Sequence, residues 1–210
     1  MKRIPEPELM LDPEQCKIYN DILSDKDNPS IKSFIKTYDL FIGITNGHII
    51  DLGTGSANFV IELCKKYPKL KVTCYEGSKT MVDIANENIA KEGLENNITM
   101  LHEDMFNAYG SYDAVLANRV LHHVNDTDSF WQLLDRLSNN LLVCDIVRPS
   151  LQVFENFISH EHGYEEDLVN SLRAAYTIDE VLDQIQIYDH NLLKEKLDWD
   201  ICRLTVYQNK

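Results

Sequence analysis

The 210-residue chain has no apolar run of about 18 residues, the length that a membrane-spanning helix needs. Its first residues, Met1-Lys2-Arg3-Ile4-Pro5-Glu6-Pro7-Glu8, have charges and prolines where a secretory signal has an apolar stretch. These two absences predict a protein that neither spans a membrane nor enters the secretory route. We therefore expect it in the cytoplasm, with no membrane partner.

Disulfide motifs are also missing. The five cysteines are an odd number, and no C-x-x-C motif occurs among them. Four of them lie inside apolar helix or strand patterns: Cys64, Cys74, Cys144 and Cys202. Free cysteine is commonly buried, so reduced thiols in a reducing compartment are expected.

The sequence also lacks a metal-ligand pattern. The nearest approach is His160-Glu161-His162, which does not have the i, i+4 spacing of a helical ligand pair. No third ligand is evident near it. We therefore predict no metal site.

Basic residues are scarce: 20 Lys and Arg stand against 34 Asp and Glu, which gives a net charge of −14. A field of this sign repels phosphate backbones and anionic headgroups, and the basic residues are scattered. We therefore expect no nucleic-acid partner, and a cationic or neutral small molecule fits better. The sequence leaves the oligomeric state open, with a homodimer as one option.

Short apolar strands alternate with helices in the middle of the chain. The predicted strands are residues 49–52, 71–75, 98–102, 112–117 and 140–146, with helices at 57–67, 79–92 and 126–137. This alternation predicts an α/β fold with a parallel sheet and helices on both faces.

The flanks of this region break the alternation. Two helices, 12–23 and 31–41, precede it, and three helical segments, 151–160, 165–175 and 178–187, follow it. The last two strands, 192–199 and 202–207, are too close for a helical crossover. They should pair as an antiparallel hairpin.

A glycine turn follows the first strand in the pattern Asp51-x-Gly53-x-Gly55. A dinucleotide-binding loop would have a third glycine at the position of Asn58, and a pyrophosphate would not favour a carboxylate nearby. S-adenosylmethionine (SAM) instead carries an ammonium and a sulfonium. At about 4 Å a carboxylate stabilises such a cation by roughly 1–4 kcal/mol. The pattern resembles the loop of SAM-binding methyltransferases, and this resemblance makes Asp51, Gly53, Thr54 and Gly55 candidate SAM-binding residues.

Further candidates follow the next three strands. Glu76, with Gly77 after it, is placed to bind both ribose hydroxyls, a feature that NAD-binding proteins share. Asp104 and Met105 are placed to meet the adenine, although a solvated turn is the alternative for the acid. Met81 is either an adenine contact or a core residue. Asn118 ends the fourth strand and faces the methionine end of SAM in this interpretation.

Residues 48–146 resemble the class I SAM-dependent methyltransferases, nearest to the quinone-biosynthesis type. The segments that carry the resemblance are Ile50-Asp51-Leu52-Gly53-Thr54-Gly55, Glu76, Asp104 and residues 112–124. Residues 3–10, 145–149 and 171–177 look like those of a narrower group of small bacterial members without a single assigned substrate. The resemblance implies a Rossmann-like seven-stranded sheet of order 3-2-1-4-5-7-6 with strand 7 antiparallel. It also implies SAM as methyl donor and S-adenosylhomocysteine (SAH) as product.

We expect a single methyltransferase domain over residues 1–210. Its parts are an N-terminal helical cap (1–45), a SAM-binding core (46–147), a helical insertion (148–190) and a C-terminal hairpin (191–210). The cap and the insertion should lie above the carboxyl edge of the sheet and enclose the pocket of a small methyl acceptor.

Methyl transfer from a sulfonium is an in-line displacement, so an enzyme mainly aligns the acceptor and removes its proton where it has one. His123 and His122 are the candidate bases, with packing and capping as the alternative. Arg148 is a candidate to bind an anionic acceptor, or else pairs with a nearby acid. Tyr19 is a candidate lid residue, or else a core contact of the cap.

Three functions remain open at this point. The first is a SAM-dependent methyltransferase that acts on a small molecule, and the second is a SAM-binding protein that does not transfer the methyl group. The third, an NAD-dependent oxidoreductase, is disfavoured by Asp51 and by Asn58 in place of the third glycine. The acceptor, and whether carbon, nitrogen or oxygen receives the methyl group, cannot be read from the sequence, because function depends on the site and not on the scaffold.

Overall fold

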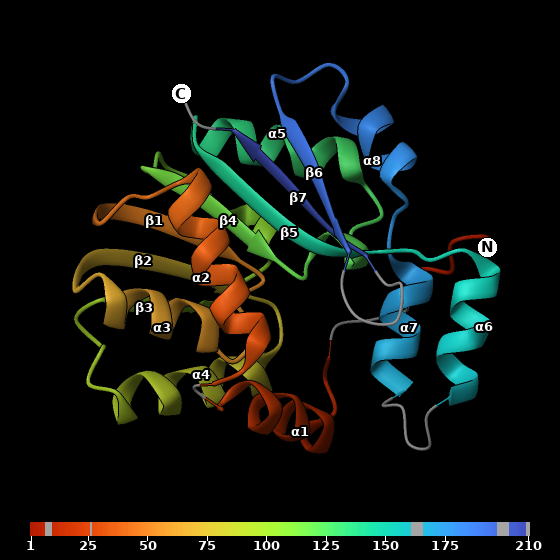
Figure 1. The fold of residues 1–210 in the computed structure, drawn as a ribbon. Coiled ribbons are helices and arrows are strands. Elements are labelled where there is room, and N and C mark those ends of the chain that lie inside the picture. The colour runs from red at the N-terminus through yellow and green to blue at the C-terminus, as the bar shows by residue number, and fades with distance from the viewer. Residues whose placement is uncertain (7–9, 26, 161–165, 197–201, 209–210) are drawn as a thin grey trace.

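A seven-stranded sheet forms the centre of the computed structural model, which describes residues 1–6, 10–25, 27–160, 166–196 and 202–208 (Figure 1). Its strands are β1 (Asn46–Leu52), β2 (Lys69–Glu76), β3 (Ile98–His102), β4 (Ala114–Asn118), β5 (Leu141–Val147), β6 (Asn191–Lys196) and β7 (Cys202–Gln208). Their order is β3-β2-β1-β4-β5-β7-β6. Strands β1 to β5 are parallel, and β7 is antiparallel to both β5 and β6. The predicted strand order and hairpin are confirmed.

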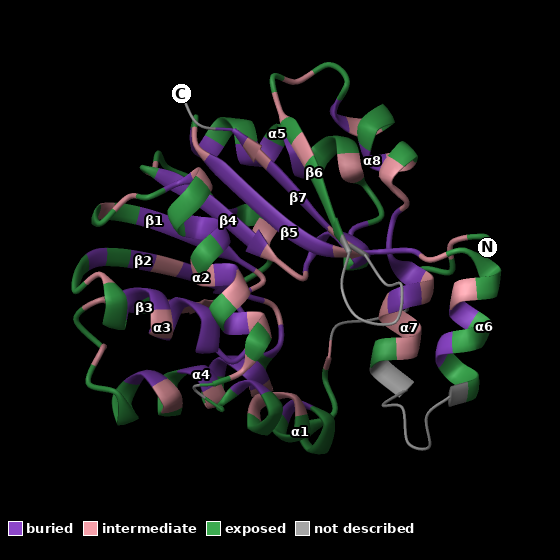
Figure 2. Cartoon of the chain, viewed as in Figure 1, coloured by how far each residue is buried: buried purple, intermediate pink, exposed green. Residues whose placement is uncertain are grey.

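Helices cover both faces of this sheet. They are α1 (Pro13–Leu23), α2 (Pro29–Phe41), α3 (Asn58–Lys66), α4 (Lys79–Lys91), α5 (Thr127–Leu137), α6 (Leu151–His160), α7 (Glu166–Ala174) and α8 (Ile178–Ile185), with short 3₁₀ helices η1 (Met105–Asn107) and η2 (Leu121–His123). One core cluster joins α2, α3 and α4 to the sheet, and a second joins α5 and α8 to it. The adjacent residues Ile49 and Ile50 enter opposite clusters and are both fully buried. Strands β4 and β5 are largely buried (Figure 2). Burial on both faces explains why β4 and β5 are almost continuously apolar.

Local sequence signals set several helix ends. The Asp12 side chain accepts a hydrogen bond from the backbone N–H of Gln15, and Pro13 opens α1. Thr177 and Glu180 form a capping box at the start of α8. Helix α2 begins at Pro29, two residues before the predicted start, because Asn28 caps it and proline suits the first turn.

The first residues of the chain form an extended arm, residues 1–6, that lies against α7 and η2. The backbone N–H of Ile4 donates to the carbonyl of Arg173 at 3.0 Å. Arg3 donates to the carbonyls of Ala174, His122 and Val124 at 2.7, 3.0 and 3.1 Å. Its guanidinium lies 4.2 Å from the centre of the Tyr176 ring. These contacts place the end of the arm beside η2.

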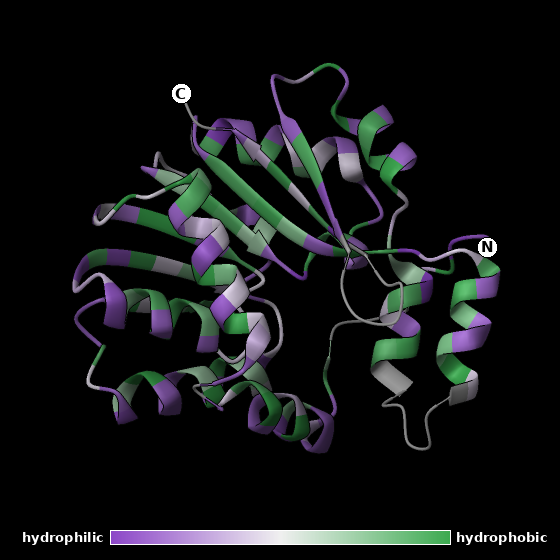
Figure 3. Ribbon diagram, in the orientation of Figure 1, coloured by the Kyte–Doolittle hydropathy of each residue, from purple (hydrophilic) through white to green (hydrophobic). Residues whose placement is uncertain are grey.

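Hydrophobic residues gather on the strands and on the helix faces that meet them (Figure 3). No helix in the described part of the chain is long and apolar enough to cross a membrane. Residue 165 of the predicted 165–175 helix and residues 197–199 of the predicted 192–199 strand lie outside the described residues.

Candidate functional site

The loop after β1 is built from unusual backbone conformations. Gly53, Gly55 and Ala57 have φ values of 67°, 59° and 65°, in the left-handed region. The backbone N–H groups of Gly53 and Thr54 both donate to the carbonyl of Tyr75 at the end of β2, at 2.8 and 3.2 Å. The loop is thereby folded back onto the neighbouring strand.

Gly53→Ala is expected to destabilise the protein more than Gly93→Ala, although both glycines have a φ of 67°. A Cβ on Gly53 would lie 2.5 Å from Val120 Cγ2, whereas a Cβ on Gly93 meets nothing within 4 Å. The left-handed backbone costs either alanine about 1–2 kcal/mol, and the clash adds about 1–3 kcal/mol. Urea unfolding of the two variants measures the difference, and equal losses would refute the clash.

Glu76 joins the loop to the start of α4. Its Oε2 accepts from the backbone N–H of Gly55 and its Oε1 from that of Ser78, both at 2.8 Å. The side chain is buried, with only 8% of the residue exposed. A carboxylate fixed in this way presents its remaining lone pairs to a ligand above the loop.

Asp51 is a buried carboxyl group at the end of β1. Burial raises its pKa to about 7, the negative charge of Glu76 adds to this rise, and the Thr54 hydroxyl opposes it. Within the described residues, no cation is among the groups that shift this pKa. The loop is therefore flanked by two buried acids, Asp51 and Glu76, and no described protein cation balances the charge of Asp51.

Helix α1 is anchored over this loop by amide side chains. Asn20 Oδ1 accepts from Asn58 Nδ2 at 3.0 Å and from Asn88 Nδ2 at 2.8 Å. Asn88 also donates to the carbonyl of Ser56 at 2.9 Å. Tyr19 Cε1 lies 3.8 Å from where a Cβ on Gly55 would stand. Asn58, which occupies the third-glycine position, thus has a definite role in joining the loop to α1.

The residues after β3 are arranged around η1. Asp104 Oδ1 accepts from the backbone N–H of Phe106 at 2.9 Å and caps this short helix. Met105 is partly buried against the second core cluster, and Met81 in α4 is 2% exposed. His102 Nε2 lies 3.1 Å from the carbonyl oxygen of Gly77, within hydrogen-bond distance.

The carboxyl end of β4 carries an enclosed amide. Among the described residues, Asn118 Nδ2 is buried without a hydrogen-bond acceptor. The next residue, Arg119, has a φ of 60°, which is uncommon for a residue other than glycine. Its guanidinium donates to Ser30 Oγ at the start of α2, at 3.0 Å.

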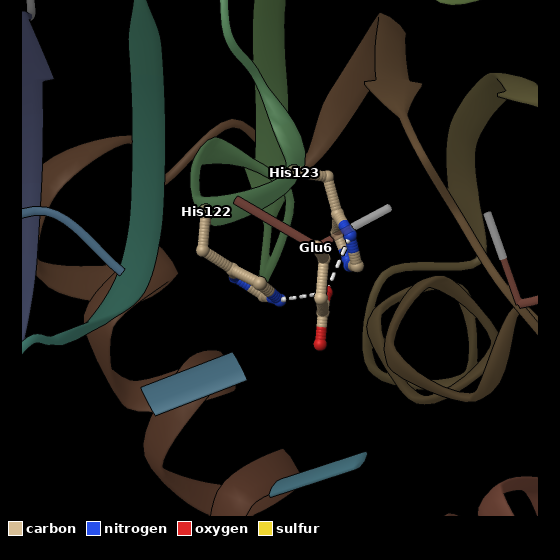
Figure 4. A group of neighbouring side chains, drawn as sticks. All are labelled: Glu6, His122 and His123. Atoms are coloured by element: carbon tan, nitrogen blue, oxygen red, sulfur yellow. Dashed lines mark ion pairs between the residues drawn. The ribbon is translucent and has the colours of Figure 1, made fainter. Parts of the chain in front are cut away.

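His122 and His123 follow on η2 and are held by two acids. Asp145 accepts from His122 at both its backbone N–H (2.9 Å) and its Nδ1 (2.7 Å). Glu6 Oε2 lies 2.7 Å from His123 Nδ1 and 3.8 Å from His122 Nε2 (Figure 4). Burial opposes ionisation of Asp145, but the positive charge and hydrogen bonds of His122 hold its pKa below its usual value.

The structure places Arg148 apart from this group. Its guanidinium donates to the carbonyl of Ala175 at 2.9 Å and forms an ion pair with Glu180. The ion pair is the alternative that the sequence left open. Glu161 and His162 of the His160-Glu161-His162 segment lie outside the described residues.

Three residues of the site were not identified from the sequence: Glu6, Asn20 and Asp145. Asp145 had a signal, because it is the one acid inside the apolar strand Leu141–Val147. Glu6 lies 116 or more positions from its histidine partners in the sequence. Asn20 lies up to 68 positions from its amide partners. No local pattern marks contacts of that separation.

A sequence profile described as "Methyltransferase domain" matches residues 45–198. The chain belongs to this methyltransferase family. Among curated proteins, it is 25% identical over 142 residues to the polyketide synthase ThaQ of Burkholderia thailandensis, which covers 64% of this chain and 7% of that protein. It is 32% identical over 73 residues to the release factor glutamine methyltransferase of Rhodopirellula baltica. This match covers 33% of this chain and 25% of that protein. The methyltransferase chain thus spans a quarter or less of these relatives.

Solved structures share the fold of this methyltransferase chain. The plantazolicin methyltransferase BpumL, solved with SAH, superposes with a TM-score of 0.68 at 18% identity over 95% of this chain and 92% of that one. A SAM-dependent methyltransferase from Aquifex aeolicus superposes with a TM-score of 0.66 at 18% identity. This match covers 95% of this chain and 100% of that one. The resemblance to class I methyltransferases is confirmed, and the quinone-biosynthesis subtype stays a prediction.

Proposed function

We propose that the protein is a SAM-dependent methyltransferase, a single domain that transfers the methyl group of SAM to a small molecule. The observation that carries the proposal is Asp51, a buried carboxyl beside a glycine loop with no described cation acting on it. A buried, ionised acid without a cationic partner is costly unless a ligand supplies the opposite charge. The ammonium and sulfonium of SAM supply it.

The other SAM contacts follow from the strand ends. Gly53, Thr54 and Gly55 would line the methionine moiety, with Asn118 at its end. Glu76, beside Gly77, would bind the ribose hydroxyls, and its fixed orientation supports this. Met81, Asp104 and Met105 would surround the adenine.

The acceptor would lie between the loop and η2, near His122 and His123, with Tyr19 as part of the lid. The place of Tyr19 beside Gly55 supports the lid. Arg148 would bind an acceptor only after its ion pair with Glu180 is broken, so the structure supports it less than the other acceptor residues. A relative named isoflavone-7-O-methyltransferase 6, from Medicago sativa, supports a small acceptor.

A label-transfer assay tests the proposal. SAM with an isotopically labelled methyl group, incubated with the protein and a metabolite extract, is expected to yield a labelled product by mass spectrometry. Asp51→Ala should lose at least about fivefold of the transfer, because about 1–4 kcal/mol of cation binding is removed. Asp128→Ala, at an exposed position at the start of α5, is the matched control and should retain the activity. Labelling that is equal in wild type and Asp51→Ala would overturn the proposal.

A further inference from the structure

Three side chains with metal-binding atoms converge beside η2. Glu6 comes from the N-terminal arm, and His122 and His123 come from η2 (Figure 4). One ligand atom from each lies within 4.8 Å of the other two. A tetrahedral metal with bonds of about 2.0–2.1 Å needs its ligand atoms roughly 3.3 Å apart, so small side-chain movements would complete the geometry.

The orientation of His122 is already that of a ligand. Its Nδ1 lies 2.7 Å from Asp145 Oδ1, and a carboxylate at this distance accepts the proton carried by Nδ1. In the neutral imidazole, which is the form that binds a metal, the lone pair of Nε2 faces Glu6 Oε2, 3.8 Å away. In metal sites, a histidine ligand usually donates its other ring N–H to a carboxylate, which fixes the tautomer and the orientation of the ring.

A hydrogen bond also fixes the orientation of the Glu6 carboxylate. Ser171 Oγ donates to Glu6 Oε1 at 3.0 Å, which turns Oε2 toward the two imidazoles. Oε2 is enclosed and lies 2.7 Å from His123 Nδ1, with which it forms an ion pair when that imidazole is protonated. The enclosed Oε2 therefore faces both imidazoles and needs positive charge beside it, which a metal ion can supply in place of the imidazole protons.

We propose that Glu6, His122 and His123 bind one divalent transition-metal ion of the zinc type. Two imidazoles and one carboxylate are a set that zinc, cobalt and iron accept, whereas magnesium and calcium prefer oxygen ligands alone. Three protein ligands leave a position open. If the proposed methyl transfer holds, an oxygen or nitrogen of the acceptor would occupy that position and lose its proton more easily. Metal binding itself does not depend on that step.

Titration of the full-length, chelator-treated protein with zinc or cobalt chloride tests the site. Wild type is expected to bind one equivalent by calorimetry, and bound cobalt should show the visible absorption of a tetrahedral ion. His123→Ala and Glu6→Gln should weaken binding by more than about 100-fold, since each removes a direct ligand. Asp145→Asn should weaken it about 10- to 100-fold, since it alters only the orientation of His122.

His48→Ala is the matched control, because His48 is exposed on β1 and contacts Thr73. It should bind the metal as wild type does. His123 is partly exposed, with 36% of its side chain accessible, so its variant should fold, and circular dichroism verifies this. Absence of one-equivalent binding in wild type, or equal binding by folded His123→Ala, overturns the proposal. SAM binding, measured on the same samples, separates this failure from failure of the proposed function.

Discussion

SAM binding is expected to release close to one proton at about pH 6 and to tighten about tenfold between about pH 6 and pH 7.5. The cause is Asp51, whose pKa burial raises to about 7 in the free protein. At pH 6 the carboxyl group is mostly protonated, and the cation of SAM favours the ionised form. Binding must therefore expel the proton at pH 6, whereas at pH 7.5 the group is already mostly ionised. Calorimetry in two buffers of different ionisation enthalpy counts the protons.

Asp51→Asn is the control for this linkage. It keeps the size of the side chain but has no proton to release, so its SAM affinity should be lower by about 5- to 1000-fold and nearly independent of pH. A proton count equal to that of wild type would place the titrating group elsewhere.

The same residue makes the stability of the free protein depend on pH. Its folded pKa of about 7 lies above the value of about 3.9 for an unfolded chain. The stabilisation is therefore complete below the unfolded pKa and is lost as the pH rises through about 7. Asp51→Asn should lack this loss in urea unfolding.

Asp145→Ala is expected to reduce the free energy of unfolding by about 3–5 kcal/mol, because it leaves a buried histidine without its charged partner. Asp145 is 2% exposed and His122 is 5% exposed. The backbone N–H and Nδ1 of His122 would both lose their acceptor. Urea unfolding of the variant measures the loss.

Asp39→Ala is the matched comparison, since Asp39 pairs with Lys66 at an exposed position. Its loss should stay within about 0–1 kcal/mol, as for other surface ion pairs. Equal losses for the two variants would show that the buried pair contributes no more than a surface pair.

Much of the fold could be predicted because its signals are local. The apolar strands, the capping residues of α1 and α8, and Gly53 and Gly55 each report on a few neighbouring positions. The strand order needed the family resemblance, since periodicity alone does not rank strands across a sheet. The antiparallel β7 was the exception, because the short connection after β6 excludes a crossover.

The site was harder to predict than the fold. Asp51 and Glu76 could be found because they end strands, which meet at one edge of a parallel sheet. Glu6 could not, because the arm reaches η2 through Arg3 and Ile4, whose partners lie more than 100 residues away. The sequence predicts no metal site, because Glu6 is more than 100 residues from His122 and His123 and such a cluster has no local spacing pattern.

A crystal structure of the protein with SAH bound tests the central claim most directly. We predict that the SAH ammonium lies within hydrogen-bond distance of Asp51, with the ribose hydroxyls on Glu76 and the sulfur directed toward η2. SAH bound away from the loop after β1, or an Asp51 carboxyl that remains without any contact to the ligand, would contradict the account.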